Sequence, residues 1–127
     1  MAQAGADGLS LVNTIRGLAV DAATGRPTLA RGVGGYSGPA LKPIALACVW
    51  ACASAVDLPI VGMGGAASAE DVGEFVAAGA SAVALGTALF VDPWLPGRIR
   101  AELDRDGTVA VTDRQPIRVE SVSPPVL

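Results

Sequence analysis

The sequence predicts an α/β fold in which parallel strands alternate with helices. Three short apolar segments, residues 9–12, 60–63 and 82–85, have the length of buried strands. Helical segments are expected at residues 40–56, 69–78 and 93–103. An alternation of this kind favours right-handed crossovers within one parallel sheet. Three strands leave two open edges, so the sheet is either small or part of a larger one.

The first strand, residues 9–12, ends on the polar pair Asn13 and Thr14. The carboxyl ends of parallel strands are where α/β proteins place ligand contacts. The same residue types also cap turns through hydrogen bonds between side chain and backbone. The residues alone leave both roles open.

A long insertion follows at residues 15–36. Residues 17–21 and 26–30 flank the turn-forming Ala23-Thr-Gly25 and predict a β-hairpin. Residues 32–39 are rich in glycine and are expected to form a loop that runs into a helix, with Pro39 near its first turn. Loops of this length are usually functional, and glycines let the backbone pass close to a flat or charged ligand. A flexible linker is the alternative.

The helix expected at residues 40–56 carries an apolar stripe at helical spacing. Its members are Leu41, Ile44, Ala45, Cys48, Val49 and Cys52. The two cysteines are four residues apart and the sequence has no histidine, so they do not complete a metal-ligand set. We expect buried, reduced thiols there. The lack of histidine also removes the commonest acid–base group.

The stretch at residues 58–66 predicts a phosphate-binding turn. Residues 60–63 form a strand that is apolar on both faces, and Gly64 and Gly65 follow at once. Ser68 and the acidic residues after it mark a helix start, and Gly79 is expected to end that helix. A strand, paired glycines and a helix start direct backbone N–H groups at an anion, which is usually a phosphate.

A second turn of the same kind ends the strand at residues 82–85, where Gly86 and Thr87 follow. In a (β/α)₈ barrel, the loops after the seventh and eighth strands commonly form a phosphate site. The N–H groups of Gly64, Gly65, Gly86 and Thr87 are therefore expected to converge on one phosphate, with the Thr87 hydroxyl as a further donor.

Composition limits the classes of function. The chain has 127 residues, of which 51% are hydrophobic and 17% charged, and its net charge is −3. Scattered basic residues on an acidic chain argue against nucleic acid as a partner. Glycine, proline or charge interrupts each apolar run before the roughly 18 residues that a membrane span needs. The N-terminus does not resemble a signal peptide, so a cytoplasmic protein is expected. The apolar excess predicts surfaces that missing chain or a partner covers, and an oligomer is expected.

Four motifs occur in order: Asn13-Thr14, GGYSGPALKP at 34–43, PIVGMGG at 59–65 and GASAVALGTA at 79–88. Together they resemble the C-terminal part of a dihydroorotate dehydrogenase, most closely the class 1B type of bacteria. The resemblance covers residues 5–103. It implies an FMN-binding (β/α)₈ barrel whose sixth, seventh and eighth strands correspond to the strands expected here. Residues 1–106 would then be a partial barrel domain, and residues 107–127 a loosely ordered tail with a candidate strand at 108–112.

The resemblance also implies roles for eight residues. Asn13 and Thr14 match the pair that binds dihydroorotate or orotate, which favours ligand contact for them over turn capping. The positions that match FMN contacts are Val12, Gly38, Gly64, Gly65, Gly86 and Thr87.

The implied activity is the FMN-dependent oxidation of dihydroorotate to orotate in de novo pyrimidine biosynthesis. The implied partner is an electron-transfer subunit with FAD and an iron–sulfur cluster. The family's cysteine base and flavin-contacting lysine belong to the part that this sequence lacks, and Lys42, Cys48 and Cys52 match neither. Lys42 is expected to be a solvated lysine at a helix start. We therefore assign no catalytic residue and no metal, and expect this chain alone to be inactive. The alternatives are a non-catalytic flavin- or phosphate-binding half-barrel and a domain of the dihydropyrimidine dehydrogenase type.

Overall fold

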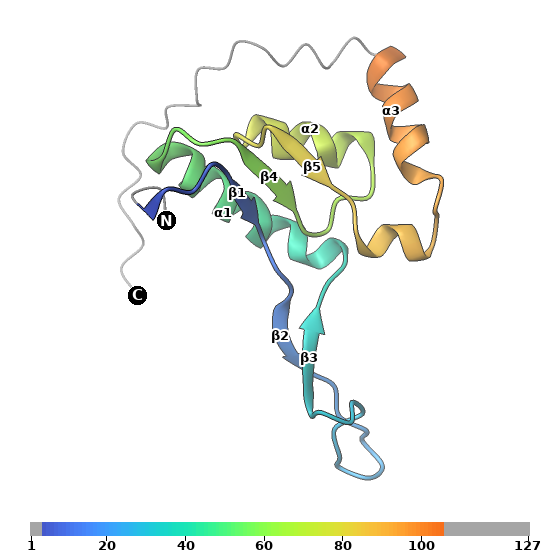
Figure 1. The fold of residues 1–127 in the computed structure, drawn as a ribbon. Coiled ribbons are helices and arrows are strands. Elements are labelled where there is room, and N and C mark those ends of the chain that lie inside the picture. The colour runs from blue at the N-terminus through green and yellow to red at the C-terminus, as the bar shows by residue number, and fades with distance from the viewer. Residues whose placement is uncertain (1–3, 106–127) are drawn as a thin grey trace.

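A three-stranded parallel sheet forms the body of the molecule in the computed structural model, which describes residues 4–105 (Figure 1). The strand order is β1–β4–β5. The strands are β1 (Leu9–Leu11), β4 (Ile60–Met63) and β5 (Ala82–Ala84). Both pairings are parallel, with Leu9 opposite Ile60 and Val61 opposite Ala82. This confirms the predicted α/β class, although β1 and β5 each end one residue earlier than expected.

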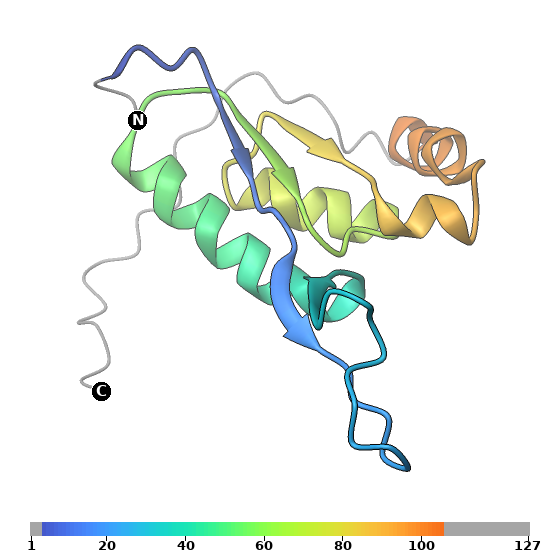
Figure 2. The same cartoon turned by 60° about the horizontal axis from the view of Figure 1, so that its bottom comes forward.

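Two helices cover one face of this sheet (Figure 2). They are α1 (Lys42–Ala55), which a 3₁₀ turn at Pro39–Leu41 precedes, and α2 (Ala69–Ala77). Together with β4 they enclose the core. Side chains of these three elements, and of two alanines in the adjoining loops, pack closely there. The core residues are Ala45, Val49, Ile60, Ala66, Phe75 and Ala80.

The opposite face of the sheet is open. Along β4, Ile60 and Gly62 are buried toward the helices, whereas Val61 points the other way and is 36% exposed. The strand is apolar on both faces, as the sequence shows, but in the described structure only one of these faces is buried. The physical reason is that no helix between residues 4 and 105 lies over that second face.

Helix α2 begins at the residue that the sequence indicates and ends one residue earlier than expected. The Ser68 side chain caps its start, because Ser68 Oγ accepts a hydrogen bond of 3.1 Å from the Asp71 N–H. Gly79 follows the helix with a φ of +111° and donates its N–H to the Val76 carbonyl at 3.0 Å. A β-carbon at Gly79 would overlap the side chain of Ala53 in α1. Only glycine therefore satisfies both the turn and the packing.

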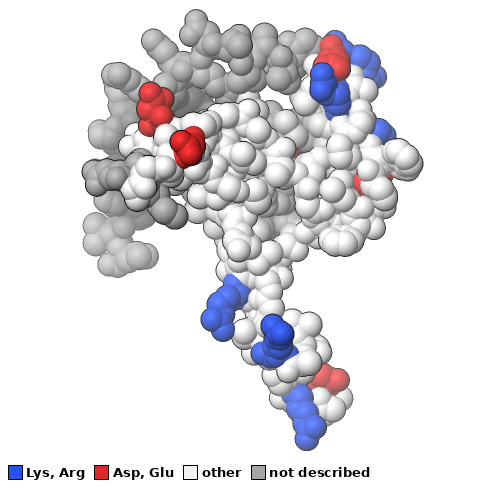
Figure 3. Space-filling view, in the orientation of Figure 1, with Lys and Arg blue, Asp and Glu red and all other residues white. Residues whose placement is uncertain are grey.

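The insertion forms a hairpin arm (residues 15–36) that projects from the body (Figures 1 and 2). Its strands are β2 (Ile15–Leu18) and β3 (Val33–Tyr36), which pair antiparallel. The predicted strands at residues 17–21 and 26–30 meet at a single isolated bridge, and the predicted glycine-rich loop is extended over β3. The glycines permit this, because a β-carbon at Gly35 would overlap the Thr14 side chain. Three arginines give the arm much of the positive charge that is visible in Figure 3.

The buried stripe of α1 is narrower than the sequence predicts. Ala45 and Val49 are buried, as is Leu41 just before the helix, whereas Ile44 is 49% exposed. Residues four apart face the sheet, and Ile44 lies on the outer side of the helix. Both cysteines are free, but they are only partly buried, whereas the sequence predicts buried thiols.

A 3₁₀ turn (Thr87–Phe90) and helix α3 (Leu95–Arg105) follow β5. Helix α3 begins and ends two residues later than expected. The predicted tail at 107–127 and its candidate strand at 108–112 lie outside the described residues. Across the described part of the chain, no helix has the length and apolar character to cross a membrane.

Candidate ligand-binding cleft

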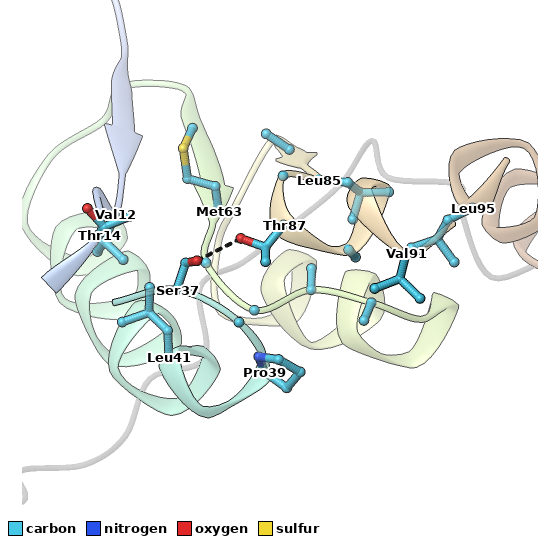
Figure 4. Close-up of a pocket in the computed structure, with 18 of the residues that line it drawn as sticks. Val12, Thr14, Ser37, Pro39, Leu41, Met63, Leu85, Thr87, Val91 and Leu95 are labelled. Carbon is cyan, nitrogen blue, oxygen red and sulfur yellow. Dashed lines mark hydrogen bonds between the residues drawn. The ribbon is translucent and has the colours of Figure 1, made fainter. Parts of the chain in front are cut away.

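A cleft of about 850 Å³ opens where the carboxyl ends of β1, β4 and β5 meet the base of the hairpin arm (Figure 4). This volume is within the range of small-molecule and cofactor sites. All eight residues singled out from the sequence line it: Val12, Asn13, Thr14, Gly38, Gly64, Gly65, Gly86 and Thr87. Parallel strands bring these distant segments together because their carboxyl ends share one edge of the sheet.

The two glycines after β4 allow their turn to lie against the start of α1. Gly64 and Gly65 have φ values of +122° and +85°, which other residues rarely adopt. A β-carbon at Gly65 would stand 2.8 Å from both the Gly38 carbonyl oxygen and the Lys42 backbone nitrogen. These glycines therefore have a packing role in addition to any contact with a ligand.

The same turns offer hydrogen-bond donors to the cleft. Within residues 4–105, the backbone N–H groups of Gly64, Gly65, Gly86 and Thr87 donate to no acceptor. Backbone N–H groups without protein partners at the end of a strand are suited to bind an anion. The residues present thus fit a phosphate group of a cofactor.

Two hydroxyl groups meet between the hairpin arm and the turn after β5. The Thr87 hydroxyl donates to the Ser37 hydroxyl across 2.9 Å, and both side chains line the cleft (Figure 4). The Ser37 hydroxyl keeps its own hydrogen for a ligand, since a hydroxyl both donates and accepts. Sequence reasoning missed Ser37. Its place directly before Gly38 in the glycine-rich segment is the signal that could have indicated it.

Asn13 combines the two roles that its sequence context left open. Its Oδ1 accepts the Thr14 N–H at 2.7 Å, which is the expected turn capping. Its side-chain amide nitrogen donates to no residue in the described part of the chain, and Asn13 and Thr14 both line the cleft. Capping therefore orients Asn13 and leaves the N–H groups of its side-chain amide accessible to a ligand.

The cleft carries little charge of its own. Asp92 and Arg98 are the charged residues among its described lining, and they form an ion pair with each other. Neither was singled out from the sequence, because nothing local marks them as part of this site. Between residues 4 and 105, no cluster of histidine, cysteine, aspartate or glutamate is suited to hold a metal ion.

Lys42 is not the solvated lysine that the sequence predicts. Its Nζ lies 2.5 Å from Asp71 Oδ1 and 2.7 Å from Glu74 Oε2, and its side chain is 24% exposed. The hydrogen bond to Asp71 and the neighbouring Glu74 carboxylate raise the pKa of Lys42. Burial opposes ionisation of Asp71, but hydrogen bonds from Lys42, Ala67 and Ser68 outweigh it and lower the pKa of Asp71. Helix α2 brings Asp71, which lies 29 residues further along the chain, and Glu74 to Lys42.

The family model of dihydroorotate dehydrogenase matches residues 1–106. The chain belongs to the dihydroorotate dehydrogenase family. Two relatives are each named as the catalytic subunit of dihydroorotate dehydrogenase B (NAD(+)). The chain is 59% identical over 101 residues to that of Anoxybacillus flavithermus and 58% identical over 101 residues to that of Bacillus caldolyticus. Each match covers 80% of this chain and 32% of the relative.

A solved structure of a dihydroorotate dehydrogenase from Eimeria tenella, in complex with ferulenol, shares the fold with a TM-score of 0.65. It is 27% identical, and the match covers 84% of this chain and 29% of that one. The chain thus spans about a third of the length of the dihydroorotate dehydrogenases that it matches. It is a partial, class 1B-like dihydroorotate dehydrogenase, in a family that depends on FMN in general.

Proposed function

We propose that this chain is the FMN-phosphate-binding portion of an enzyme that oxidises dihydroorotate to orotate. One observation carries the proposal. The eight residues that match cofactor and substrate positions of the family come from separate segments and line one cleft. Four of them hold backbone N–H groups for which the described chain provides no acceptor.

We also propose that β1, β4 and β5 are the sixth, seventh and eighth strands of a (β/α)₈ barrel, and that residues 1–106 make up this partial domain. Their parallel order and the helices on one face support this. The open second face is where a barrel would place its interior. The glycine turns after β4 and β5 then occupy the usual phosphate position of such barrels.

FMN, when bound, would supply the acceptor for the hydride that leaves dihydroorotate. The residues of this chain would bind and orient. The turns at Gly64–Gly65 and Gly86–Thr87 would hold the phosphate by hydrogen bonds, and Asn13 and Thr14 would hold polar groups of the substrate. Fixing both molecules in one geometry lowers the barrier to transfer. Within residues 4–105, the lining has no histidine, cysteine or lysine, and its one carboxylate, Asp92, is paired with Arg98. We therefore propose that the base that takes the substrate proton belongs to another part of the complete enzyme.

The names of the relatives support a further part of the proposal. They are named as catalytic subunits, which implies a further subunit. We propose that this is an electron-transfer subunit with FAD and an iron–sulfur cluster that would reoxidise the complete enzyme.

Binding of FMN and of riboflavin, which lacks the phosphate, tests the proposal. The purified chain should bind FMN more tightly than riboflavin, as measured by quenching of flavin fluorescence. Thr87→Val keeps the side-chain shape but removes the hydroxyl. It should weaken FMN binding about tenfold, because the Thr87 hydroxyl, which would turn from Ser37 to the phosphate when FMN binds, then no longer donates a hydrogen bond to this charged group. Riboflavin binding should not change. Thr24→Val, at the exposed tip of the hairpin arm, is the matched control.

Equal affinity of the wild-type chain for FMN and riboflavin would refute the phosphate site. Dihydroorotate oxidation, followed with a dye as electron acceptor, tests the division of roles. We expect no turnover by the FMN-loaded chain alone. Turnover at the rate of a full-length relative would show that the base lies within this chain.

A further inference from the structure

An ionic cluster lies directly behind the glycine turn that follows β4. Lys42, the first residue of α1, contacts two carboxylates of α2, with 2.5 Å to Asp71 Oδ1 and 2.7 Å to Glu74 Oε2. The Asp71 contact is a hydrogen bond, whereas the Glu74 contact is an ion pair without hydrogen-bond geometry. The Lys42 and Asp71 side chains are largely buried, at 24% and 15% exposure. Partly buried pairs are screened less by salt than surface pairs are.

Asp71 connects this cluster to the turn. Its second oxygen, Oδ2, accepts the backbone N–H of Ala67 at 2.8 Å. Its own N–H donates to Ser68 Oγ at 3.1 Å. One carboxylate thus holds α1 through Lys42 and the loop through Ala67. The segment between Gly65 and Ser68 is thereby attached to both helices.

Lys42 restrains the turn from the other side. Its backbone nitrogen lies so close to Gly65 that a β-carbon there would stand 2.8 Å away. The turn is therefore confined between the start of α1 and the first turn of α2. Backbone N–H groups that are fixed in direction bind an anion without an ordering cost at the moment of binding.

A direct role for Lys42 as the positive charge of the site does not fit the geometry. Two carboxylates face this ammonium, so the cluster as a whole is negative. Lys42 is also absent from the residues that line the cleft. The cluster must act through the shape of the turn and not through its charge.

We propose that Lys42 and Asp71 are positioning residues for the phosphate, because they fix the Gly64–Ala67 turn in the conformation that binds it. This inference rests on the proposed function. It deepens that function by naming residues that touch neither cofactor nor substrate. The turn that they fix binds the phosphate. Loss of either residue should therefore weaken binding of the phosphate group and not binding of the rest of the flavin.

Comparison of FMN with riboflavin separates positioning from a general loss of structure. Lys42→Met removes the charge and keeps most of the side-chain length. We expect FMN binding to weaken about tenfold, as is typical when a residue that orients a ligand-binding group is lost, with riboflavin binding unchanged. Lys42→Arg should restore most of the FMN affinity. Asp71→Asn, which keeps the shape, is the second variant in case Lys42→Met fails to fold.

Arg100→Met is the matched control. It removes the ion pair with Asp104 in α3, which is 3.5 Å long, 80% exposed at the arginine and outside the cleft. Hydrogen exchange of the Ala67 amide, measured by NMR without any flavin, is the second measurement. This exchange should be about tenfold faster in Lys42→Met and Asp71→Asn, and unchanged in Arg100→Met, because opening of the loop then costs less.

The outcomes are distinguishable. If Thr87→Val weakens FMN binding but Lys42→Met and Asp71→Asn do not, the positioning role is wrong and the proposed function stands. Equal losses of FMN and riboflavin affinity would show that the pair supports the fold in general and would overturn the inference. A wild-type chain without preference for FMN over riboflavin overturns both proposals.

Discussion

Replacement of Gly65 by alanine should strongly destabilise the protein. The residue has a φ of +85°, and this left-handed conformation costs alanine about 1–2 kcal/mol. The new methyl group would also lie 2.8 Å from the Gly38 carbonyl oxygen and from the Lys42 backbone nitrogen. Both are backbone atoms that cannot rotate away. Overpacking of this kind costs about a further 1–3 kcal/mol.

Gly25→Ala is the matched control. Gly25 also has a positive φ, +65°, but nothing lies within 4 Å of the position its β-carbon would take. Both substitutions reduce the backbone conformational entropy of the unfolded chain by the same amount, so this effect cancels in the comparison. Gly25→Ala should therefore show the conformational cost alone, and Gly65→Ala should lose about 1–3 kcal/mol more.

Urea unfolding followed by circular dichroism measures both losses, at one protein concentration because association shifts apparent stability. The free energy of unfolding should fall by about 2–5 kcal/mol in Gly65→Ala, a large share of the total stability of a typical domain. Equal losses in the two variants would refute the reasoning, because they would show that the start of α1 yields to the new methyl group.

Two further predictions concern pH and association. The pKa of Asp71 is lowered in the folded state, so its contribution to stability is complete above its unfolded pKa and is lost as the pH falls through its folded pKa. The stability difference between the wild-type protein and Asp71→Asn should therefore shrink below about pH 4, and a constant difference down to pH 2 would contradict this. The chain should also self-associate at micromolar concentration in sedimentation velocity, because Phe90, Val91 and Trp94 are almost fully exposed and β1 and β5 each have an edge without a partner strand within residues 4–105. Phe90→Ser with Trp94→Ser should reduce the association, and a monomeric wild-type chain would refute the prediction.

Local signals were sufficient for the body of the fold. β4 was predictable from four apolar residues after a proline, and α2 from Ser68 at one end and Gly79 at the other. Each of these signals acts within a few residues of the chain. The grouping of Asn13, Thr14 and the four residues of the glycine turns in one cleft was predictable as well, because parallel strands place their carboxyl ends at one edge. The places of Val12 and Gly38 were indicated by the family resemblance alone.

A hairpin in the insertion was predictable, whereas the extended strand β3 and the partners of Lys42 were not, for two different reasons. Glycine in a sequence indicates a turn, but β3 is extended because pairing with β2 satisfies its backbone and Thr14 leaves no room for a side chain at Gly35. The partners of Lys42 follow 29 and more residues later, and no local pattern links them. Contacts of this range depend on how α1 and α2 pack, which only the assembled structure determines.

The hairpin arm leaves and rejoins the body through one opposed pair of residues, Ile15 and Tyr36. The neighbours of this pair, Thr14 and Ser37, line the cleft. The chain enters and leaves the arm at this one residue pair. The distance between Thr14 and Ser37 therefore does not depend on the length of the arm beyond that pair. We expect that insertions, deletions or replacements in the outer part of the arm are tolerated. The width of the cleft at Thr14 and Ser37 should stay the same in such variants.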